Sequence, residues 1–207
     1  MRNATKVTVS TFGAIVGLMG IEHGIGEALQ GNIAPSGLVI LSWPGSEFFR
    51  ILAGEPAMTV VPNLLVTGIL AILVSLVFLV WTTVFVERKN AGLVLILLSI
   101  VMLLVGGGFG PPMIGIIVGA AATRINAPLT WWRAHLSVSL RRFLGQRWQW
   151  SLVACVIAWL LLFPGISVVA YFFGMNDPGL IAVIFFSAFP CKSTNREPRK
   201  RLIILFR

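Results

Sequence analysis

The sequence is poor in charge, and above all in acid. Only 11% of its 207 residues are charged, and only 7 of them are Asp or Glu. Soluble globular proteins carry about 25% charged residues, so this composition excludes an ordinary water-soluble domain. What the chain has instead is apolar sequence, with 57% hydrophobic residues and a mean hydropathy of +0.92. This balance predicts an integral membrane protein, with the lipid bilayer as its main partner.

Cysteine is scarce, and the common catalytic motifs are missing. Cys155 and Cys191 allow one disulfide at most, and we place both near the cytoplasm, where thiols stay reduced, so we expect no bridge. The chain contains no phosphate-binding Walker loop, dinucleotide fingerprint, HExxH, GxSxG or CxxC. We therefore expect a protein that is not an enzyme and that carries no cofactor.

The net charge of +9 could suggest a nucleic-acid-binding protein. That interpretation requires lysines and arginines clustered on one soluble face. Here they are distributed between long apolar runs, as in a membrane protein with basic loops. We expect no nucleic-acid partner.

Several apolar stretches are long enough to cross a bilayer. A helix rises about 1.5 Å per residue, so a hydrocarbon core of about 30 Å needs roughly 20 apolar residues. We predict an all-α, polytopic helical transmembrane bundle of five full spans plus a sixth, short or incomplete one. The predicted spans are residues 7–29, 63–86, 91–105, 113–125, 150–171 and 180–190. Together they make one transmembrane domain, residues 1–190, followed by a basic cytoplasmic tail, residues 191–207.

The stretch GGGFGPP, residues 106–112, divides a long apolar run into two spans because glycine and proline do not continue a helix. The rival threading treats residues 91–122 as one span, which would export the arginines of residues 123–149. With the run divided, every lysine and arginine except Arg50 lies on the same side. Since positive charge marks the cytoplasmic side, we predict a multi-pass plasma-membrane protein with a cytoplasmic N-terminus.

The two ends of the chain leave alternatives open. Residues 180–190 could form a re-entrant half-span, a sixth helix lengthened by its neighbours, or a helix cut short by a change of reading frame. Residues 1–28 could be a signal peptide with cleavage after Ala28, although charged residues just before the cut are unusual in such peptides.

Two segments do not span. Residues 31–62 form an outer loop too apolar to extend into water, and we predict a lid in which Ser46 caps a short helix that ends at Gly54. Residues 126–149 form an inner loop, which we interpret either as an interfacial helix facing anionic lipid or as an ordinary basic loop. The apolar positions at helical spacing in this loop are Trp132, Leu136, Leu140 and Phe143, with Arg133, Ser137 and Arg141 on a neighbouring face.

Small residues line one face of the first span. Stripes of this kind let helix backbones approach closely in lipid, although glycine is also simply common in membrane helices. The glycines of the stripe are Gly13, Gly17, Gly20 and Gly24. Gly115 and Gly119 make a similar face on the fourth span, which is a candidate packing partner.

Three polar residues follow in the last turns of the first span. Glu22 lies about 22 Å along the helix from its start, still within the hydrocarbon, where an ionised group costs a few kcal/mol. His23 and Glu27 share a helix face, whereas Glu22 points about 140° away from Glu27. An acid in such a place suggests a function by default.

Three interpretations of these residues compete. Glu22 could pair with another helix or with Arg50, or the three residues could form a proton or cation site facing a cavity. They could also bind a divalent metal, but no further His or Cys lies nearby, and His135 falls on the opposite side of the membrane. From the sequence we expect no metal.

These residues suggest two functions. The first is a small transporter or ion-coupled permease using the acidic site at the outer end of the first span, as a monomer or homo-oligomer. The alternative is a non-catalytic membrane component that packs through its glycine faces with another membrane protein and regulates it.

Overall fold

The structure is a computed structural model, and it describes residues 4–125, 127, 130–174, 177, 179 and 183. Apart from residue 183, the predicted segment 180–190 lies outside the described residues, as do the predicted tail 191–207 and Cys191. The described part of the chain is mostly helical. Its α-helices are α1 (Ala4–Leu29), α2 (Leu64–Val84), α3 (Ala91–Leu104), α4 (Gly110–Ala122), α5 (Thr130–His135), α6 (Val138–Leu160) and α7 (Ile166–Phe173).

Three helices are long and apolar enough to cross a membrane: α1, α2 and the continuous helix Val138–Phe173. The other two apolar helices, α3 and α4, have 14 and 13 residues. At about 1.5 Å per residue each extends only about 20 Å, less than the thickness of the hydrocarbon core.

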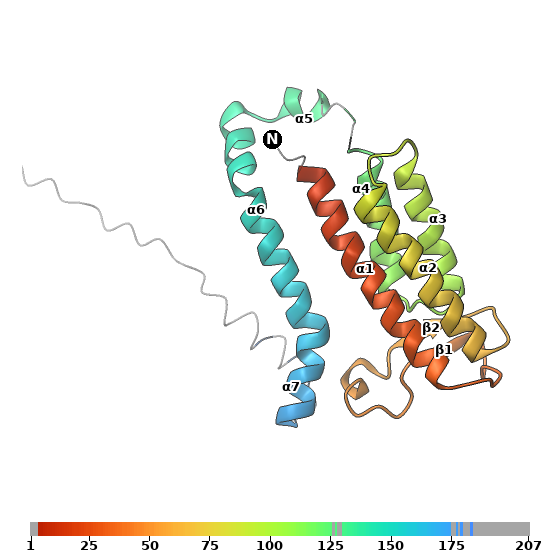
Figure 1. Cartoon of the computed structure of the whole chain (residues 1–207). Helices are drawn as coiled ribbons and strands as arrows, with labels where there is room; N and C mark the ends of the chain where they lie inside the picture. Colours follow the sequence, from red (N-terminus) through yellow and green to blue (C-terminus); the bar gives the residue numbers. More distant parts are fainter. Residues whose placement is uncertain are drawn as a thin grey trace, which may run out of the picture.

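Helices α1 to α4 form an antiparallel ring in which each helix contacts its two neighbours (Figure 1). The chain runs up and down through the ring, as expected for helices joined by short connections. The turn between α2 and α3 lies at the same end as the N-terminus, where Lys6 forms an ion pair with Glu87 at 2.8 Å.

The ends of the helices follow from local sequence. The side chain of Asn63 caps α2 by accepting a hydrogen bond from the backbone N–H of Val66. Asn90, before α3, adopts a left-handed conformation with φ 64°. Pro111 and Pro112 lie in the first turn of α4, where a missing N–H costs no helical hydrogen bond.

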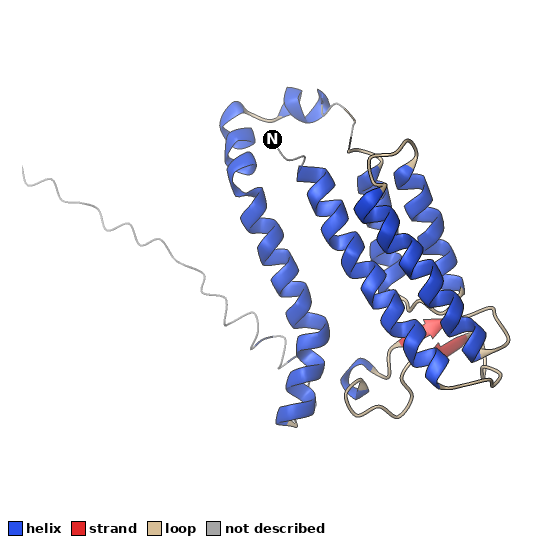
Figure 2. Ribbon diagram, in the orientation of Figure 1, coloured by secondary structure: helices blue, strands red, loops and turns tan. Residues whose placement is uncertain are grey.

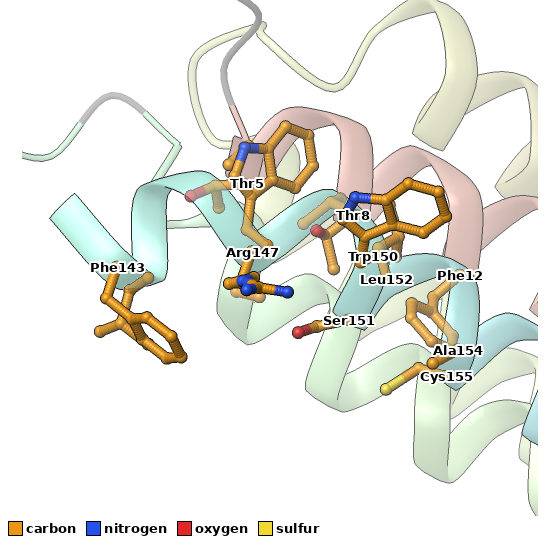
Figure 3. A pocket seen from close by; sticks show the side chains of 15 residues that line it. Thr5, Thr8, Phe12, Phe143, Arg147, Trp150, Ser151, Leu152, Ala154 and Cys155 are labelled. Atoms are coloured by element: carbon orange, nitrogen blue, oxygen red, sulfur yellow. The ribbon is translucent and has the colours of Figure 1, made fainter. Parts of the chain in front are cut away.

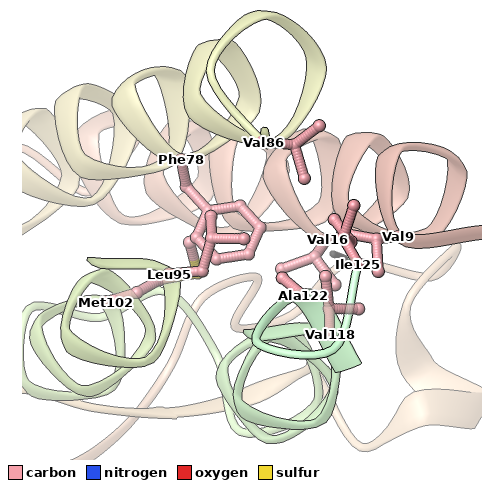
Figure 4. Packing of buried hydrophobic residues seen from close by; sticks show 9 residues of the cluster. All are labelled: Val9, Val16, Phe78, Val86, Leu95, Met102, Val118, Ala122 and Ile125. Carbon is pink, nitrogen blue, oxygen red and sulfur yellow. The ribbon is translucent and has the colours of Figure 1, made fainter. Parts of the chain in front are cut away.

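The core of the ring is a cluster of buried apolar side chains contributed by all four helices (Figure 4). Phe78 from α2 is the largest of them and is fully buried. The cluster comprises Val9, Val16, Phe78, Val86, Leu95, Met102, Val118, Ala122 and Ile125.

The glycine face of α1 packs against α2. A β-carbon built on Gly68 of α2 would lie 2.4 Å from the carbonyl oxygen of Gly24, so the two backbones nearly touch. The same construction on Gly13, Gly17 and Gly20 meets α2 side chains within 2.8 Å. The prediction that α4 is the partner of this face is wrong.

The glycines of α4 pack elsewhere, against α3. A β-carbon on Gly115 would lie 2.4 Å from Oγ of Ser99, and one on Gly119 would lie 2.7 Å from the side chain of Ile96. The small residues of α1 and α4 therefore serve two separate helix pairs, α1 with α2 and α3 with α4.

The lid contains an element that the all-α prediction missed. Strands β1 (Val39–Leu41) and β2 (Pro56–Met58) pair antiparallel at one end of the ring (Figure 2). The backbone N–H of Gly106 donates to the carbonyl of Met58 at 2.9 Å. The strand pair is thereby joined to the turn between α3 and α4.

The predicted helix from Ser46 to Gly54 does not form. The segment is a series of turns with a single 3-10 helix, η1 (Arg50–Leu52). Its end does match the expected stop, since Ala53 and Gly54 both have positive φ, of 54° and 71°.

Of the two interpretations of the inner loop, a single interfacial helix through Trp132, Leu136, Leu140 and Phe143 is wrong, because the chain bends at Leu136 between α5 and α6. Ser137 caps α6 by accepting from the N–H of Leu140. Helix α6 then continues into the predicted fifth span, so that half of the predicted inner loop belongs to the same long helix. Pro164 lacks an N–H donor, and the helix widens around it into a π turn, η2 (Leu161–Gly165).

Helix α7 brings the end of this long helix to the lid. Ile166 and Ala170 are buried and pack with Ile51 of η1. The ring centroids of Phe48, in the lid, and Tyr171, in α7, are 6.0 Å apart. The part of the lid around η1 thus lies between the four-helix ring and α7 (Figure 1).

Candidate functional site

The polar residues predicted from α1 lie in its last two turns, beneath the lid. His23 is 4% exposed and Glu27 is fully buried. The lid adds Ser42, which is also fully buried, and Glu55, whose side chain is 13% exposed. The site is therefore built from one helix and from two lid residues that follow strand β1 and precede strand β2.

On one side of His23, Ser42 connects the imidazole to Glu27. The distance from Nδ1 of His23 to Oγ of Ser42 is 2.8 Å, and Oγ donates to Oε1 of Glu27 at 3.2 Å. A serine hydroxyl has one hydrogen to donate. Since that hydrogen goes to Glu27, we infer that Nδ1 of His23 carries a hydrogen and donates it to Ser42.

On the other side of His23, two carboxylates face Nε2. Oε2 of Glu55 lies 3.3 Å from Nε2, and Glu22 is close enough to Glu55 for their carboxyl groups to share a hydrogen bond. One ligand-type atom from each of Glu22, His23 and Glu55 lies within 4.8 Å of the other two.

This face of the site consists mainly of acceptors, with the indole N–H of Trp43 as a donor close to Glu22. A neutral imidazole that is protonated at Nδ1 presents a lone pair at Nε2. Oε1 of Glu22 and Oε2 of Glu55 are buried and have no hydrogen-bond partner among the described residues. Burial raises the pKa of Glu55 above its ordinary value. Such an arrangement is stable only when a positive charge or a shared proton lies between the acceptors.

The lid explains how residues on two faces of α1 belong to one site. Helix α1 continues unbroken to Leu29, so Glu22 and Glu27 keep the divergent directions expected from their spacing. Ser42 reaches Glu27, and Glu55 reaches Glu22. His23 lies between the two lid residues and contacts both.

The turn between α3 and α4 closes the site. A β-carbon on Gly108 would lie 2.4 Å from Nε2 of His23, and one on Gly106 would lie 2.1 Å from Oε2 of Glu27. Both glycines also have positive φ, of 77° and 92°, which side chains rarely tolerate. The GGGFG stretch is thus both a turn and part of the wall of the site.

The predicted pairing of Arg50 with Glu22 is not what the structure shows. Arg50 forms its ion pair with Glu47, at 3.3 Å on the exposed side of the lid, and Glu22 lies beside Glu55 instead. Helix α5, which ends at His135, lies at the opposite end of the molecule (Figure 1).

A cavity of about 360 Å³ opens beside the two carboxylates. Glu22 and Glu55 line it together with apolar side chains from α1, the lid and the α6–α7 helix, including Phe49, Trp159 and Phe163. No lysine or arginine is among the described residues that line it. A ligand in this cavity would meet two carboxylates within an apolar wall.

A larger cavity, of about 920 Å³, lies at the other end of α1. Figure 3 shows its lining between the first turns of α1 and the middle of α6, with Phe143, Arg147 and Trp150 among the side chains. Its charged lining residue is basic and its walls are mainly apolar, so it offers no convergent set of ligand atoms.

Sequence reasoning missed Ser42 and Glu55 as site residues. Both lie in the lid, and nothing in their spacing connects them to α1. Acidic residues are scarce, with only 7 in the chain. An acid in an apolar loop, such as Glu55, could therefore have been predicted as a partner of Glu22.

Comparison with known proteins gives no guide to the chemistry of this site. No protein-family model matches the chain, and searches of curated proteins and of solved structures found no match. The function is therefore argued from the geometry alone.

Proposed function

We propose that this chain is a multi-pass plasma-membrane protein that works as a small cation-coupled permease. The observation that carries the proposal is the cluster of Glu22, His23 and Glu55, with His23 buried and the two acids partly buried, beside a cavity with no basic residue in its described lining. Ionisable groups at membrane depth are costly and mark ion pathways in transporters.

The threading in this proposal has five spans and a cytoplasmic N-terminus. Helices α1 to α4 alternate in direction, and the basic turn after α2 and the arginines after α4 lie at the end where the N-terminus lies (Figure 1). The excess of Lys and Arg at this end supports a cytoplasmic location. The cation site then opens towards the outer face.

The short helices α3 and α4 fit this threading because the lid covers the part of the membrane thickness that these helices do not span. Backbone that is not helical is tolerated at membrane depth only where protein covers it and its hydrogen bonds are satisfied. The N–H of Val60 donates to the carbonyl of Leu104, and that of Gly106 donates to Met58. The backbone groups of the lid and those at the ends of the short helices thus form hydrogen bonds with one another.

The inner half of α6 supports a contact with anionic lipid. Arg141, Arg142 and Arg147 are exposed on this helix, near the exposed aromatic side chains of Phe143 and Trp150. Arginine beside aromatic rings at the membrane surface favours anionic headgroups. These residues support a lipid surface, rather than a soluble ligand, as the partner of the basic end.

Flux through reconstituted protein tests the proposal. Proteoliposomes would be given gradients of H⁺, Na⁺, K⁺, Mg²⁺ and Mn²⁺ in turn, with an ion-sensitive dye inside and protein-free liposomes as the blank. We expect flux of at least one of these cations above the blank. Glu22→Gln should reduce it at least tenfold, because the neutral amide removes the charge and keeps the shape.

Glu87→Gln is the matched control. Glu87 is exposed at the opposite end of the bundle, in its ion pair with Lys6, so its neutralisation should leave the flux unchanged. Flux equal to that of empty liposomes for every cation would overturn the proposal. Unchanged flux in Glu22→Gln would do so as well, and a stoichiometric membrane partner would then favour the regulatory function.

A further inference from the structure

We propose that Glu22, His23 and Glu55 are the ligands of a site for one divalent first-row transition metal ion. The inference rests on the proposed function and deepens it by naming the class of cation. One imidazole nitrogen and two carboxylates suit Mn²⁺, Fe²⁺, Co²⁺ or Zn²⁺. Mg²⁺ and Ca²⁺ prefer oxygen ligands alone, and Cu⁺ prefers sulfur.

The first argument is the spacing of the ligand atoms. Two atoms that each lie about 2.1 Å from a tetrahedral ion are roughly 3.4 Å apart. Nε2 of His23 and Oε2 of Glu55 are separated by 3.3 Å. All three ligand-type atoms lie within 4.8 Å of one another, so a small movement of the Glu22 side chain would complete three corners around one ion.

The second argument is the orientation of the histidine. A metal-binding histidine usually donates its other ring N–H to a neighbouring acceptor, which fixes the ring and its tautomer. Ser42 accepts from Nδ1 of His23 at 2.8 Å and is itself held by Glu27 at 3.2 Å. This arrangement turns the lone pair of Nε2 towards the two carboxylates. The imidazole is almost completely buried, since only 5% of the His23 side chain is exposed.

The third argument is charge. With both carboxyl groups ionised, as metal binding requires, the neutral imidazole and the two carboxylates carry two negative charges, which one divalent ion neutralises. The nearest charged groups that the structure places around them are acidic, Glu27 through Ser42 and the two ligand acids themselves. The cavity beside Glu22 and Glu55 gives an ion a route to the site and room for water as a further ligand.

The sequence alone gave a thinner ligand set, because only Glu22, His23 and Glu27 are neighbours along the chain. The fold replaces Glu27 with Glu55 as a ligand and moves Glu27 to a supporting position behind Ser42. The assignment therefore depends on the lid lying where the structure places it.

Metal binding to the full-length protein in detergent tests this inference. The protein would be stripped with a chelator and dialysed against Zn²⁺ or Co²⁺, and bound metal would be counted by mass spectrometry. We expect one ion per chain. Bound Co²⁺ should also show visible absorption bands characteristic of nitrogen and oxygen ligands in low coordination number.

Single substitutions identify the ligands. His23→Gln and Glu55→Gln should each weaken Zn²⁺ binding at least 100-fold, and Ser42→Ala should weaken it about 10- to 100-fold, as expected for a group behind a ligand. Glu47→Gln in the same lid and His135→Ala at the other end are the matched controls and should bind as the wild type does. Zn²⁺ should raise the unfolding temperature of wild type and of both controls, but not of His23→Gln.

Three results would overturn the inference: no bound Zn²⁺ or Co²⁺ in the wild type, equal binding in His23→Gln and the controls, or displacement of Zn²⁺ by an equal concentration of Mg²⁺. These failures are distinct from failure of the permease. If flux depends on Glu22 but no metal binds, only the metal-site inference fails. If metal binds but no cation flux is seen, only the permease proposal fails.

Discussion

Gly108 lies so close to His23 that a β-carbon on the glycine would be 2.4 Å from Nε2 of the imidazole. The two residues come from different helix ends and are distant in sequence, and the turn between α3 and α4 brings them together. The atom that Gly108 would crowd is the nitrogen that faces Glu22 and Glu55. The size of residue 108 therefore controls the space available to a ligand.

Gly108→Ala should weaken both cation flux and Zn²⁺ binding by roughly tenfold or more, the scale of a perturbed support for a ligand. Gly45→Ala is the control. Gly45 has a similar φ, 73° against 77° for Gly108, but a β-carbon there meets nothing within 4 Å. Both variants should carry similar backbone strain, and only Gly108→Ala should lose binding. Equal loss in the two would show that strain, and not the contact with His23, is responsible.

Gly68→Ala should destabilise the protein by about 1–3 kcal/mol, because an added methyl group is forced into a closely packed contact. The new β-carbon would lie 2.4 Å from the carbonyl oxygen of Gly24, a backbone atom that cannot rotate away. Unfolding by denaturant in mild detergent, followed by circular dichroism, measures the change.

The control for this crossing is Gly145→Ala in α6. A β-carbon at Gly145 meets nothing within 4 Å, and alanine favours helix over glycine by about 0.5–1 kcal/mol. Gly145→Ala should therefore be neutral or slightly stabilising. A Gly68→Ala variant as stable as wild type would mean that α1 and α2 are not in this close contact.

Ser42→Ala should cost about 1–3 kcal/mol of stability, because it leaves a buried imidazole N–H and a buried carboxylate without their shared partner. Ser42 is fully buried between His23 and Glu27. Ser36→Ala, an exposed position in the same lid, should change stability little. Thermal unfolding of the two variants measures this difference. Equal unfolding temperatures for Ser42→Ala and Ser36→Ala would argue against the hydrogen bonds of Ser42 to His23 and Glu27.

The proposed orientation in the membrane predicts a labelling pattern. In a background with Cys155→Ser and Cys191→Ser, an impermeant thiol reagent applied to intact cells should label Ser36→Cys in the lid. It should label Val138→Cys at the start of α6 only after the cells are permeabilised. Both positions are exposed in the structure, so a difference in labelling reports the side of the membrane. The opposite pattern would invert the threading and place the acidic site on the cytoplasmic face.

Helix positions were predictable where long apolar runs meet strong local signals. The glycines and prolines of residues 106–112 separate two helices in both the prediction and the structure, and the predicted spans 63–86 and 91–105 begin within one residue of α2 and α3. The interfacial helix was predicted wrongly because apolar spacing continues through Leu136, whereas Ser137 caps a new helix one residue later. Periodicity shows which residues could share a face, and a competing cap decides whether one helix carries them.

Local composition was enough to show that the chain is apolar and mostly helical. It was also enough to single out Glu22, His23 and Glu27, because ionisable groups are costly in an apolar helix wherever that helix lies in the fold. The residues that join them became visible only in the folded protein. Ser42, Glu55 and the glycines at 106 and 108 reach the site through pairing of the lid strands and packing of the short helices. Such contacts depend on distances between segments far apart in the chain, and no local pattern encodes them.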